Sequence, residues 1–280
     1  MSIEEKPLLR LEGIVKHFTS RDVKQQAGGK KSVAAVDGVS LTIHRNEIIA
    51  LVGESGSGKS TLGRIAVGLE VPDAGKVIFH DSEWSGSRKQ IPEAWRGKRQ
   101  MVFQSPHSSL NPRHTIADSL AEPLRLAGWE RSRTERRIST IMEWLMLPEK
   151  ALERYPHQFS GGQLQRIAIG RAIAAEPELI VADEPVASLD TSTQIQILEL
   201  FKTIRQETSV ACLFITHGLQ TVRWLADQMA VMKSGKLVEV SYAETFFSQP
   251  QHPYSRSLLE AVPVPDPTRN RISGDEEGDG

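Results

Sequence analysis

Apolar and polar residues alternate along two early segments, residues 8–18 and Val33–Ile43. A period of two is typical of a strand with one buried face, so both segments predict β-sheet. Between them, residues 19–32 contain Gly28-Gly29 and three lysines, which predicts a solvated loop.

Three later segments are continuously apolar: Ile48–Val52, residues 179–182 and residues 212–215. Such runs are typical of parallel strands covered on both faces by helices, so they predict an α/β core. Residues 106–156 differ, because their apolar positions follow helical spacing, at Ile138, Ile141, Met142 and Leu145. We therefore expect a mostly helical subdomain inserted into the α/β body.

The composition excludes several kinds of site and several classes of protein. The 280 residues carry 34 Lys and Arg against 35 Asp and Glu, a net charge of −1, which gives no global argument for nucleic-acid binding. The lone cysteine, Cys212, excludes an internal disulfide and any Cys-based zinc or iron–sulfur site within one chain. The apolar runs are strand-sized and the first six residues contain two acids, so neither a membrane span nor a secretory leader is expected. The composition predicts a soluble, cytoplasmic protein.

One glycine-rich segment, Gly53-Glu54-Ser55-Gly56-Ser57-Gly58-Lys59-Ser60, follows a buried strand and precedes a helix-capable run, 61–69. This is a phosphate loop in its required context. Its curled backbone turns N–H groups toward a phosphate, Lys59 adds a charge at the β- and γ-phosphates, and Ser60 supplies a hydroxyl for Mg²⁺. The expected phosphate-binding residues are Gly53, Ser55, Gly56, Ser57, Gly58, Lys59, Ser60 and Thr61.

Two acids end the apolar run 179–182. Asp183 is placed to hold Mg²⁺, and Glu184 is placed to accept a proton from an attacking water. Acids also commonly begin loops, but beside a phosphate loop that alternative is the weaker one.

The segment Phe159-Ser160-Gly161-Gly162-Gln163 resembles the signature of the ATP-binding cassette family. The resemblance implies an α/β phosphate-loop fold of that type, with an N-terminal antiparallel β-subdomain and an inserted α-helical subdomain. It also implies that the signature acts in trans, completing the ATP site of a second cassette, with Ser160, Gly161, Gly162 and Gln163 as its residues. Dimerisation would then be a condition of turnover.

Further residues follow from the same resemblance. Phe18 matches the aromatic that stacks on adenine, although an ordinary buried strand aromatic is about as good an explanation. Gln104 matches a glutamine that reaches Mg²⁺, and His217 a catalytic histidine at the γ-phosphate. The loop that crosses the dimer interface is matched by Ser188, Leu189 and Asp190. Ala187 and Gly218 depart from the family pattern, where serine and aspartate are usual.

Two segments, 104–113 and 252–263, resemble importers of peptides, opines and nickel. The second begins His252-Pro253-Tyr254 and, with its prolines, predicts an extended peptide on the domain surface. We expect an ATPase domain over residues 1–240, with the helical insertion at about 105–163. A C-terminal extension over 241–280 is expected to end in a disordered acidic tail. Because no cysteine follows residue 252, no iron–sulfur cluster is expected.

The resemblance thus implies an ATPase, using ATP and Mg²⁺, that powers solute import by cassette dimerisation. Its implied partners are a second ATPase subunit of a different chain, two membrane permease subunits and an extracytoplasmic solute-binding protein. No nucleic acid is expected, because the arginines of residues 125–137 alternate with Glu130 and Glu135 as on a solvated helix face. The location implied is peripheral, on the cytoplasmic face of the membrane.

An alternative is a non-transport cassette of a carbon–phosphorus lyase complex, because such subunits share the His-Pro-Tyr ending. Cassettes of DNA repair need long coiled coils, and those of translation carry two cassettes on one chain; this chain has neither. The substrate stays open among peptides, opine-type metallophores and nickel, with peptides first on frequency alone.

Overall fold

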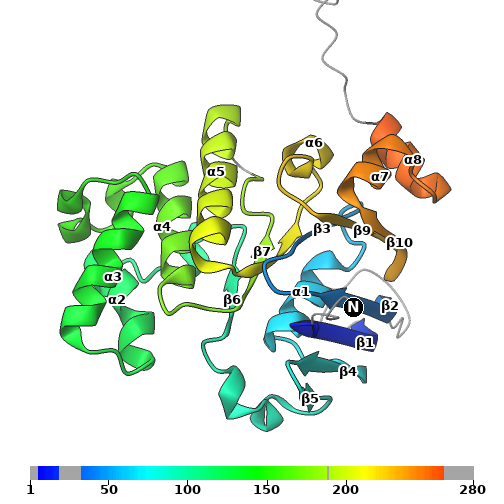
Figure 1. Cartoon of the computed structure of the whole chain (residues 1–280), viewed down its shortest axis with the longest axis horizontal. Helices are drawn as coiled ribbons and strands as arrows, with labels where there is room; N and C mark the ends of the chain where they lie inside the picture. Colours follow the sequence, from blue (N-terminus) through cyan, green and yellow to red (C-terminus); the bar gives the residue numbers. More distant parts are fainter. Residues whose placement is uncertain (1–5, 19–32, 188, 262–280) are drawn as a thin grey trace, which may run out of the picture.

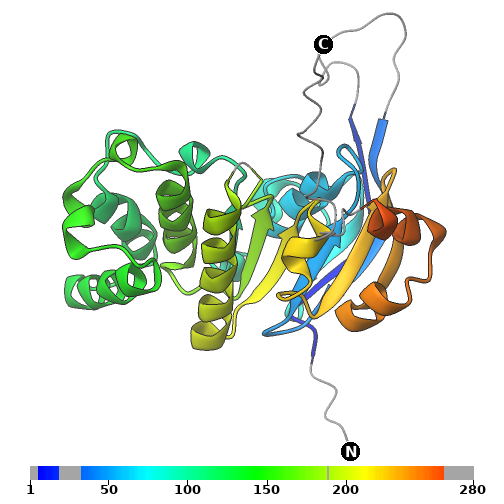
Figure 2. The same ribbon diagram turned by 90° about the horizontal axis from the view of Figure 1, so that it is seen from above.

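The computed structural model describes residues 6–18, 33–187 and 189–261. Two sheets lie side by side, and a helical subdomain extends from the larger one (Figures 1 and 2). The predicted loop at 19–32 and the acidic tail lie outside the described residues. Within them, no helix is both long enough and apolar enough to cross a membrane.

The smaller sheet is antiparallel, as the family resemblance implies. Its order is β2-β1-β4-β5. Leu9 at the start of β1 pairs with Ile43 on one side and Phe79 on the other, and the inward side chains are almost fully buried. The strands are β1 (Leu9–Phe18), β2 (Val33–Ile43), β4 (Ala74–Phe79) and β5 (Ser82–Trp84).

The larger sheet has the order β10-β9-β3-β8-β7-β6. Neighbouring strands run parallel from β9 to β6, and β10 pairs antiparallel with β9. Every residue of β3, β7 and β8 is buried, which explains why these strands read as continuous apolar runs. The strands are β3 (Ile48–Val52), β6 (Arg99–Val102), β7 (Leu179–Asp183), β8 (Ala211–Ile215), β9 (Gln228–Lys233) and β10 (Lys236–Tyr242).

Successive residues of β3 enter two different cores. Ile49 and Leu51 pack with α1 (Lys59–Val67) and the antiparallel sheet. Ile48, Ala50 and Val52 pack in the second core, which includes α5 (Thr191–Thr208) and the helical subdomain. The alternation fixes α1 and α5 on opposite faces, so the loops at the carboxyl ends of the strands are held between them.

The inserted subdomain contains α2 (Ile116–Leu126), α3 (Arg131–Trp144) and α4 (Gly161–Ile173). Of the four apolar positions predicted at helical spacing, Ile138, Ile141 and Met142 lie on α3 and Leu145 follows its last residue; all four are buried in the core. Shorter 3₁₀ turns occupy Arg88–Gln90, Glu93–Trp95, Pro106–Ser108, Glu149–Glu153 and Pro156–Gln158.

The arginine-rich face of α3 is only partly solvated, which corrects the sequence prediction. Arg131 forms an exposed ion pair with Glu135. Arg137 instead donates hydrogen bonds of 3.0 and 3.2 Å to the carbonyl oxygens of Ile173 and Ala174. Burial lowers its pKa. The side chain therefore satisfies the carboxyl end of α4, where a cation is favoured by the helix dipole.

The C-terminal extension adds α7 (Ala243–Ser248) and α8 (Pro253–Glu260), after the short α6 (Leu219–Val222). The predicted extended peptide is wrong for residues 253–260, which form a helix. His252 is the N-cap, its Nδ1 accepting a hydrogen bond from the Tyr254 N–H, and Pro253 takes the first helical position. Proline is favoured there because its missing N–H would have no helical partner.

Candidate active site

The phosphate loop joins β3 to α1. Gly53, Gly56 and Gly58 have φ values of 147°, 79° and 105°, a region that L side chains rarely adopt. A Cβ on Gly58 would lie 1.9 Å from the carbonyl oxygen of Ala35, so glycine is also required by space. A pocket of about 210 Å³ opens along the loop, lined by Phe18, Ala35, Ser55, Gly56, Gly58, Lys59, Ser60, Thr61 and Glu184.

Lys59 is folded onto its own loop. Its Nζ donates hydrogen bonds of 2.8 Å to the carbonyl oxygens of Gly53 and Glu54, and only 5% of the residue is exposed. Burial lowers its pKa, while the nearby carboxylates of Glu184, Asp183 and Glu54 act in the opposite direction. The ammonium is thus held at one place on the pocket wall.

Ser60, which lines the pocket, contacts Asp183 at the end of β7. The Ser60 hydroxyl donates a 2.8 Å hydrogen bond to Asp183 Oδ1. Burial of the Asp183 carboxyl raises its pKa, which is the response expected of an anion that lacks a full counter-charge. A hydroxyl paired with a carboxylate is the hard oxygen donor set that Mg²⁺ prefers, so the residues fit that ion.

Glu184 lies between two other residues that the family resemblance assigns to the ATP site. Its Oε2 accepts a hydrogen bond from Gln104 Nε2 at 3.2 Å, and its Oε1 lies 3.5 Å from His217 Nδ1. The residue has a φ of 49°, a left-handed conformation that turns the chain as β7 ends, and its N–H donates to the Ile215 carbonyl. The segments that follow β6, β7 and β8 therefore meet at one carboxylate, that of Glu184.

The departure at Gly218 leaves this arrangement intact. Its N–H donates a 3.0 Å hydrogen bond to the Thr216 hydroxyl, and His217 remains beside Glu184. A Cβ at position 218 would lie 2.6 Å from the Thr221 hydroxyl oxygen, so a side chain here requires Thr221 to move.

The signature lies elsewhere on the chain. Ser160 caps α4, and its side chain and that of Gln163 exchange hydrogen bonds with each other's backbone N–H. A Cβ on Gly162 would lie 2.2 Å from Thr193 Cγ2 on α5. No signature residue lines the pocket of the phosphate loop, and Figures 1 and 2 place α4 on the other side of α5 from α1.

The predicted interface loop adjoins the signature. Ser188 lies outside the described residues. Asp190 is the N-cap of α5 and accepts hydrogen bonds from the Thr193 N–H and hydroxyl and from Ser192. These bonds lower the pKa of Asp190. Leu189 is the nearest side chain to Gly161, 3.9 Å from an added Cβ.

Two contacts of the site are absent from the sequence predictions. Buried Gln165 donates from Nε2 to the Phe103 carbonyl at 3.4 Å, joining α4 to the residue before Gln104. Tyr254 accepts a 3.1 Å hydrogen bond from the Glu54 N–H of the phosphate loop. The second pair is 200 residues apart, and no local pattern marks it.

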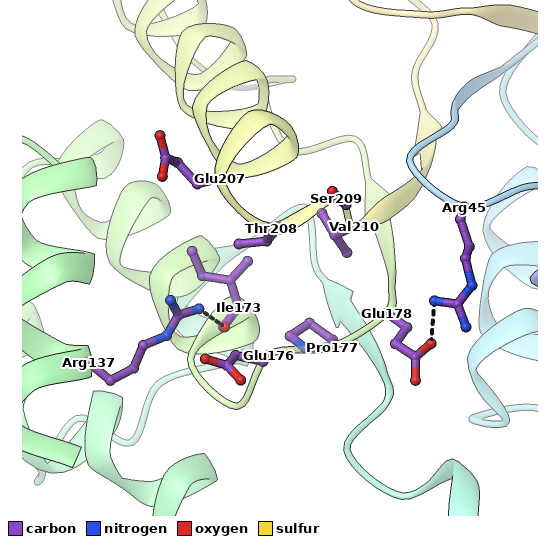
Figure 3. A pocket seen from close by; sticks show the side chains of 10 residues that line it. All are labelled: Arg45, Arg137, Ile173, Glu176, Pro177, Glu178, Glu207, Thr208, Ser209 and Val210. Atoms are coloured by element: carbon purple, nitrogen blue, oxygen red, sulfur yellow. Dashed lines mark hydrogen bonds and ion pairs between the residues drawn. The ribbon is translucent and has the colours of Figure 1, made fainter. Parts of the chain in front are cut away.

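A larger pocket of about 350 Å³ lies at the amino ends of β7 and β8, at the opposite edge of the sheet (Figure 3). Several of its charged groups already have partners. Glu178 contacts Arg45 at 2.9 Å and Arg137 bonds to the Ile173 carbonyl. Ligands of parallel α/β sheets bind at the carboxyl ends of the strands, so the phosphate-loop pocket is the candidate active site.

A buried strand β3, a phosphate loop, a following helix, and a second buried strand β7 that lies beyond β8 and ends in two acids define a phosphate-loop NTPase. Comparison with known families narrows this class. Residues 36–187 match the model of the family described as ABC transporter, and residues 238–278 match that of the oligopeptide/dipeptide transporter C-terminal region. The chain belongs to the ATP-binding cassette transporter family, as an ATPase of its α/β fold.

Curated proteins similar to this chain are named as ATP-binding proteins of oligopeptide transport. The oligopeptide transport ATP-binding protein OppF of Lactococcus lactis subsp. lactis is 48% identical over 85% of this chain and 75% of its own. OppF of Bacillus subtilis is 43% identical over 95% of this chain and 86% of its own. These names agree with transport rather than with the carbon–phosphorus lyase alternative.

Solved structures share the fold. A dimeric cassette in a post-hydrolysis state, bound to ADP and Pi, superposes with a TM-score of 0.71 at 26% identity, covering 84% of this chain and 98% of that one. The Clostridium perfringens protein cbiO1 superposes with a TM-score of 0.74 at 24% identity, over 88% and 92% of the two chains.

Proposed function

We propose that this chain is the ATP-hydrolysing subunit of a peptide importer. The observation that carries the proposal is the pocket lined jointly by Phe18, the phosphate loop and Glu184. It combines an aromatic surface, phosphate donors and a carboxylate. The peptide cargo rests on the names of the relatives and on the C-terminal family match.

In this proposal ATP enters with adenine on Phe18, which lines the same pocket as the loop. The N–H groups of the loop and the amino end of α1 face the phosphates. Lys59 adds its charge at the β- and γ-phosphates, from the position fixed by the Gly53 and Glu54 carbonyls. Thr61 on α1, which lines the same pocket, is the last of the assigned phosphate-binding residues.

Magnesium is assigned to Ser60, Asp183 and Gln104. The ion supplies positive charge that offsets the charge developing on the phosphates. Ser60 and Asp183 already form one hydrogen-bonded pair, so the two oxygens are close enough to serve a common ligand. The raised pKa of Asp183 is relieved when a cation is bound.

Glu184 acts as general base toward the attacking water. Gln104 and His217 both contact the carboxylate of Glu184. Both residues therefore orient it. His217 is also assigned to the γ-phosphate. General-base catalysis of this kind contributes about 10²–10⁴ in rate.

The complete site needs a second cassette. The phosphate loop and the signature lie on opposite sides of α5, so one chain does not close its own site. Ser160, Gly161, Gly162 and Gln163 are assigned to ATP held by a partner cassette of a different chain. Ser188, Leu189 and Asp190 are assigned to the crossing between the two.

The remaining partners are two permease subunits and an extracytoplasmic peptide-binding protein. This subunit is placed peripherally on the cytoplasmic face of the membrane. Residues 104–125, which follow β6 and enter α2, are assigned to permease docking. Gln104 is thus the first residue of the proposed docking surface.

The test is purification of the tagged full chain from native membranes. We expect two permeases and a second cassette to co-purify, and peptide-loaded binding protein to stimulate ATP hydrolysis by the reconstituted complex. The Lys59→Ala complex, assembled in the same way, serves as the control and should show no stimulation. Recovery of a complex without permeases, or stimulation by nickel salts but not by peptides, would contradict the proposal.

A further inference from the structure

The C-terminal extension reaches the phosphate loop from the side away from the nucleotide pocket. Tyr254 of α8 is 7% exposed, and its hydroxyl oxygen accepts the 3.1 Å hydrogen bond from the Glu54 N–H. A second, small pocket of about 80 Å³ lies here, lined by Glu54, Ser55, Gly56, Ser57, Lys233, Ser234 and Tyr254. It shares Ser55 and Gly56 with the nucleotide pocket, so the loop backbone is a wall of both.

One peptide group joins Tyr254 to Lys59. The Gly53 carbonyl accepts from Lys59 Nζ at 2.8 Å, and the N–H of the same peptide is the Glu54 N–H that donates to Tyr254. In a trans peptide these two groups point in opposite directions. The tyrosine hydroxyl therefore restrains rotation of the group that holds the lysine.

The extension is itself anchored. Glu239 on β10 is 9% exposed as a residue, and its carboxylate accepts hydrogen bonds from the N–H groups of His252 and Gln251, at 2.8 and 3.1 Å. Lys233 at the end of β9 places its Nζ 4.4 Å from the centre of the Tyr254 ring. These contacts fix the start of α8 and the tyrosine ring above the loop.

The β9–β10 turn holds the other end of the loop. The Gly235 N–H donates a 3.0 Å hydrogen bond to the Ser57 carbonyl. A Cβ on Gly53 would lie 2.1 Å from the Met232 carbonyl oxygen, so the loop is pressed against β9. Residues C-terminal to 228 thus contact the loop at both Glu54 and Ser57.

We propose that Tyr254 is a positioning residue for the phosphate loop, through which the anchored C-terminal extension sets the affinity for the nucleotide phosphates. The hydroxyl holds the Gly53–Glu54 peptide, that peptide holds Lys59, and the lysine is presented to the phosphates already oriented. The inference rests on the proposed assignment of the nucleotide to this loop.

The test compares Tyr254→Phe with Tyr242→Phe in the full chain. Tyr242 is 70% exposed and lies on β10 outside the loop pocket, so its variant is the matched control. We expect Tyr254→Phe to raise the Kd for ATP and ADP about threefold to tenfold, the effect of one net hydrogen bond. The KM of the assembled ATPase rises in parallel, while kcat stays within about twofold, and the control is unchanged.

Glu239→Ala provides a second, independent disturbance. It releases the N–H groups of Gln251 and His252, and should raise the same Kd. Because both substitutions act through one contact, their effects should not add. The Kd for ATP of Tyr254→Phe/Glu239→Ala should be no higher than that of the single variant with the higher Kd. Additive effects would contradict the pathway from Glu239 through Tyr254 to the loop.

Lys59→Ala separates the two possible failures. If it binds ATP as tightly as the unmodified chain, the assignment of the nucleotide to this loop is wrong. If it loses ATP while Tyr254→Phe leaves Kd and KM unchanged, only the positioning role is overturned. A purely structural role for Tyr254 would lower the Tm without moving either constant.

Discussion

The amide of Gln104 donates a 3.2 Å hydrogen bond to the carboxylate of Glu184. The two residues follow the neighbouring strands β6 and β7, and Gln104 opens the segment assigned to the permease. The proposed base is therefore in direct contact with the first residue of the proposed docking surface. We therefore expect movement of that surface to change the orientation of the base without any intermediate residue.

Replacing Gln104 tests this link. In Gln104→Ala the Glu184 carboxylate loses one of its two partners, so kcat for ATP hydrolysis should fall about tenfold, as expected for a lost hydrogen bond to a charged group. The Kd for ATP measured without Mg²⁺ should stay within about twofold. Gln100→Ala is the control, because Gln100 lies on β6, the strand that precedes Gln104, and its side chain bonds only weakly, at 3.5 Å, to the Gly97 carbonyl. Equal loss of kcat in both variants would contradict the role of Gln104.

The packing of the signature against α5 makes Gly162 sensitive to a single methyl group. An alanine Cβ would lie 2.2 Å from Thr193 Cγ2, and Thr193 is pinned by its hydrogen bonds to Asp190. Overpacking should cost about 1–3 kcal/mol, partly offset by the helix propensity of alanine. We expect thermal unfolding to show a Tm several degrees lower for Gly162→Ala.

A neighbouring glycine and a compensating change provide the controls for that measurement. Gly161→Ala should not lower the Tm, because its Cβ would meet only Leu189 at 3.9 Å, an ordinary contact distance. Thr193→Ser removes the colliding methyl while keeping the hydroxyl, so Gly162→Ala/Thr193→Ser should recover most of the lost Tm. No recovery would show that the collision is not the cause.

Cys212 offers a probe of the central sheet. It lies in β8, is 2% exposed, and burial raises the pKa of its thiol well above the usual range. The thiolate that reacts with disulfide reagents is therefore absent from the native state. We expect no labelling of the folded chain over hours and one thiol per chain after unfolding in guanidinium. Native labelling at the rate of a free thiol would contradict the burial.

The anchor of the C-terminal extension should depend on pH. Burial alone would raise the pKa of Glu239, but the hydrogen bonds that its carboxylate accepts outweigh burial and hold the pKa below 4.5. Its contribution is therefore fully present above pH 4.5 and is lost as the pH falls through the lower native pKa. The Tm difference between the unmodified chain and Glu239→Gln should be largest near neutral pH and shrink below pH 4.5. A difference that grows in acid would contradict this sign.

The sheets and the phosphate loop could be predicted because their patterns are local. β3 and β7 are short apolar runs between turn residues, and the loop carries its chemistry in eight consecutive positions. The contacts of Glu54 with Tyr254 and of Gln104 with Glu184 could not be predicted in this way. They depend on the order of strands in space, which no periodicity records.

The errors also have physical reasons. Prolines near residue 253 suggested an extended peptide, yet a proline at the first helical position leaves the following turns free to form α8. Arg137 belongs to a charged run, but it lies one turn from Arg133 on the side of α3 that meets the end of α4. Its long side chain donates hydrogen bonds to the carbonyl oxygens at the end of α4 rather than to water.

The central claim is that Glu184, although it lines the nucleotide pocket, acts as the general base for ATP hydrolysis and contributes little to the affinity for ATP. Its most direct test measures ATP hydrolysis and ATP binding together for Glu184→Gln in the assembled complex. We predict that hydrolysis falls at least about 100-fold, while the Kd for ATP stays within about threefold of the unmodified value. Hydrolysis near the unmodified rate would contradict the claim.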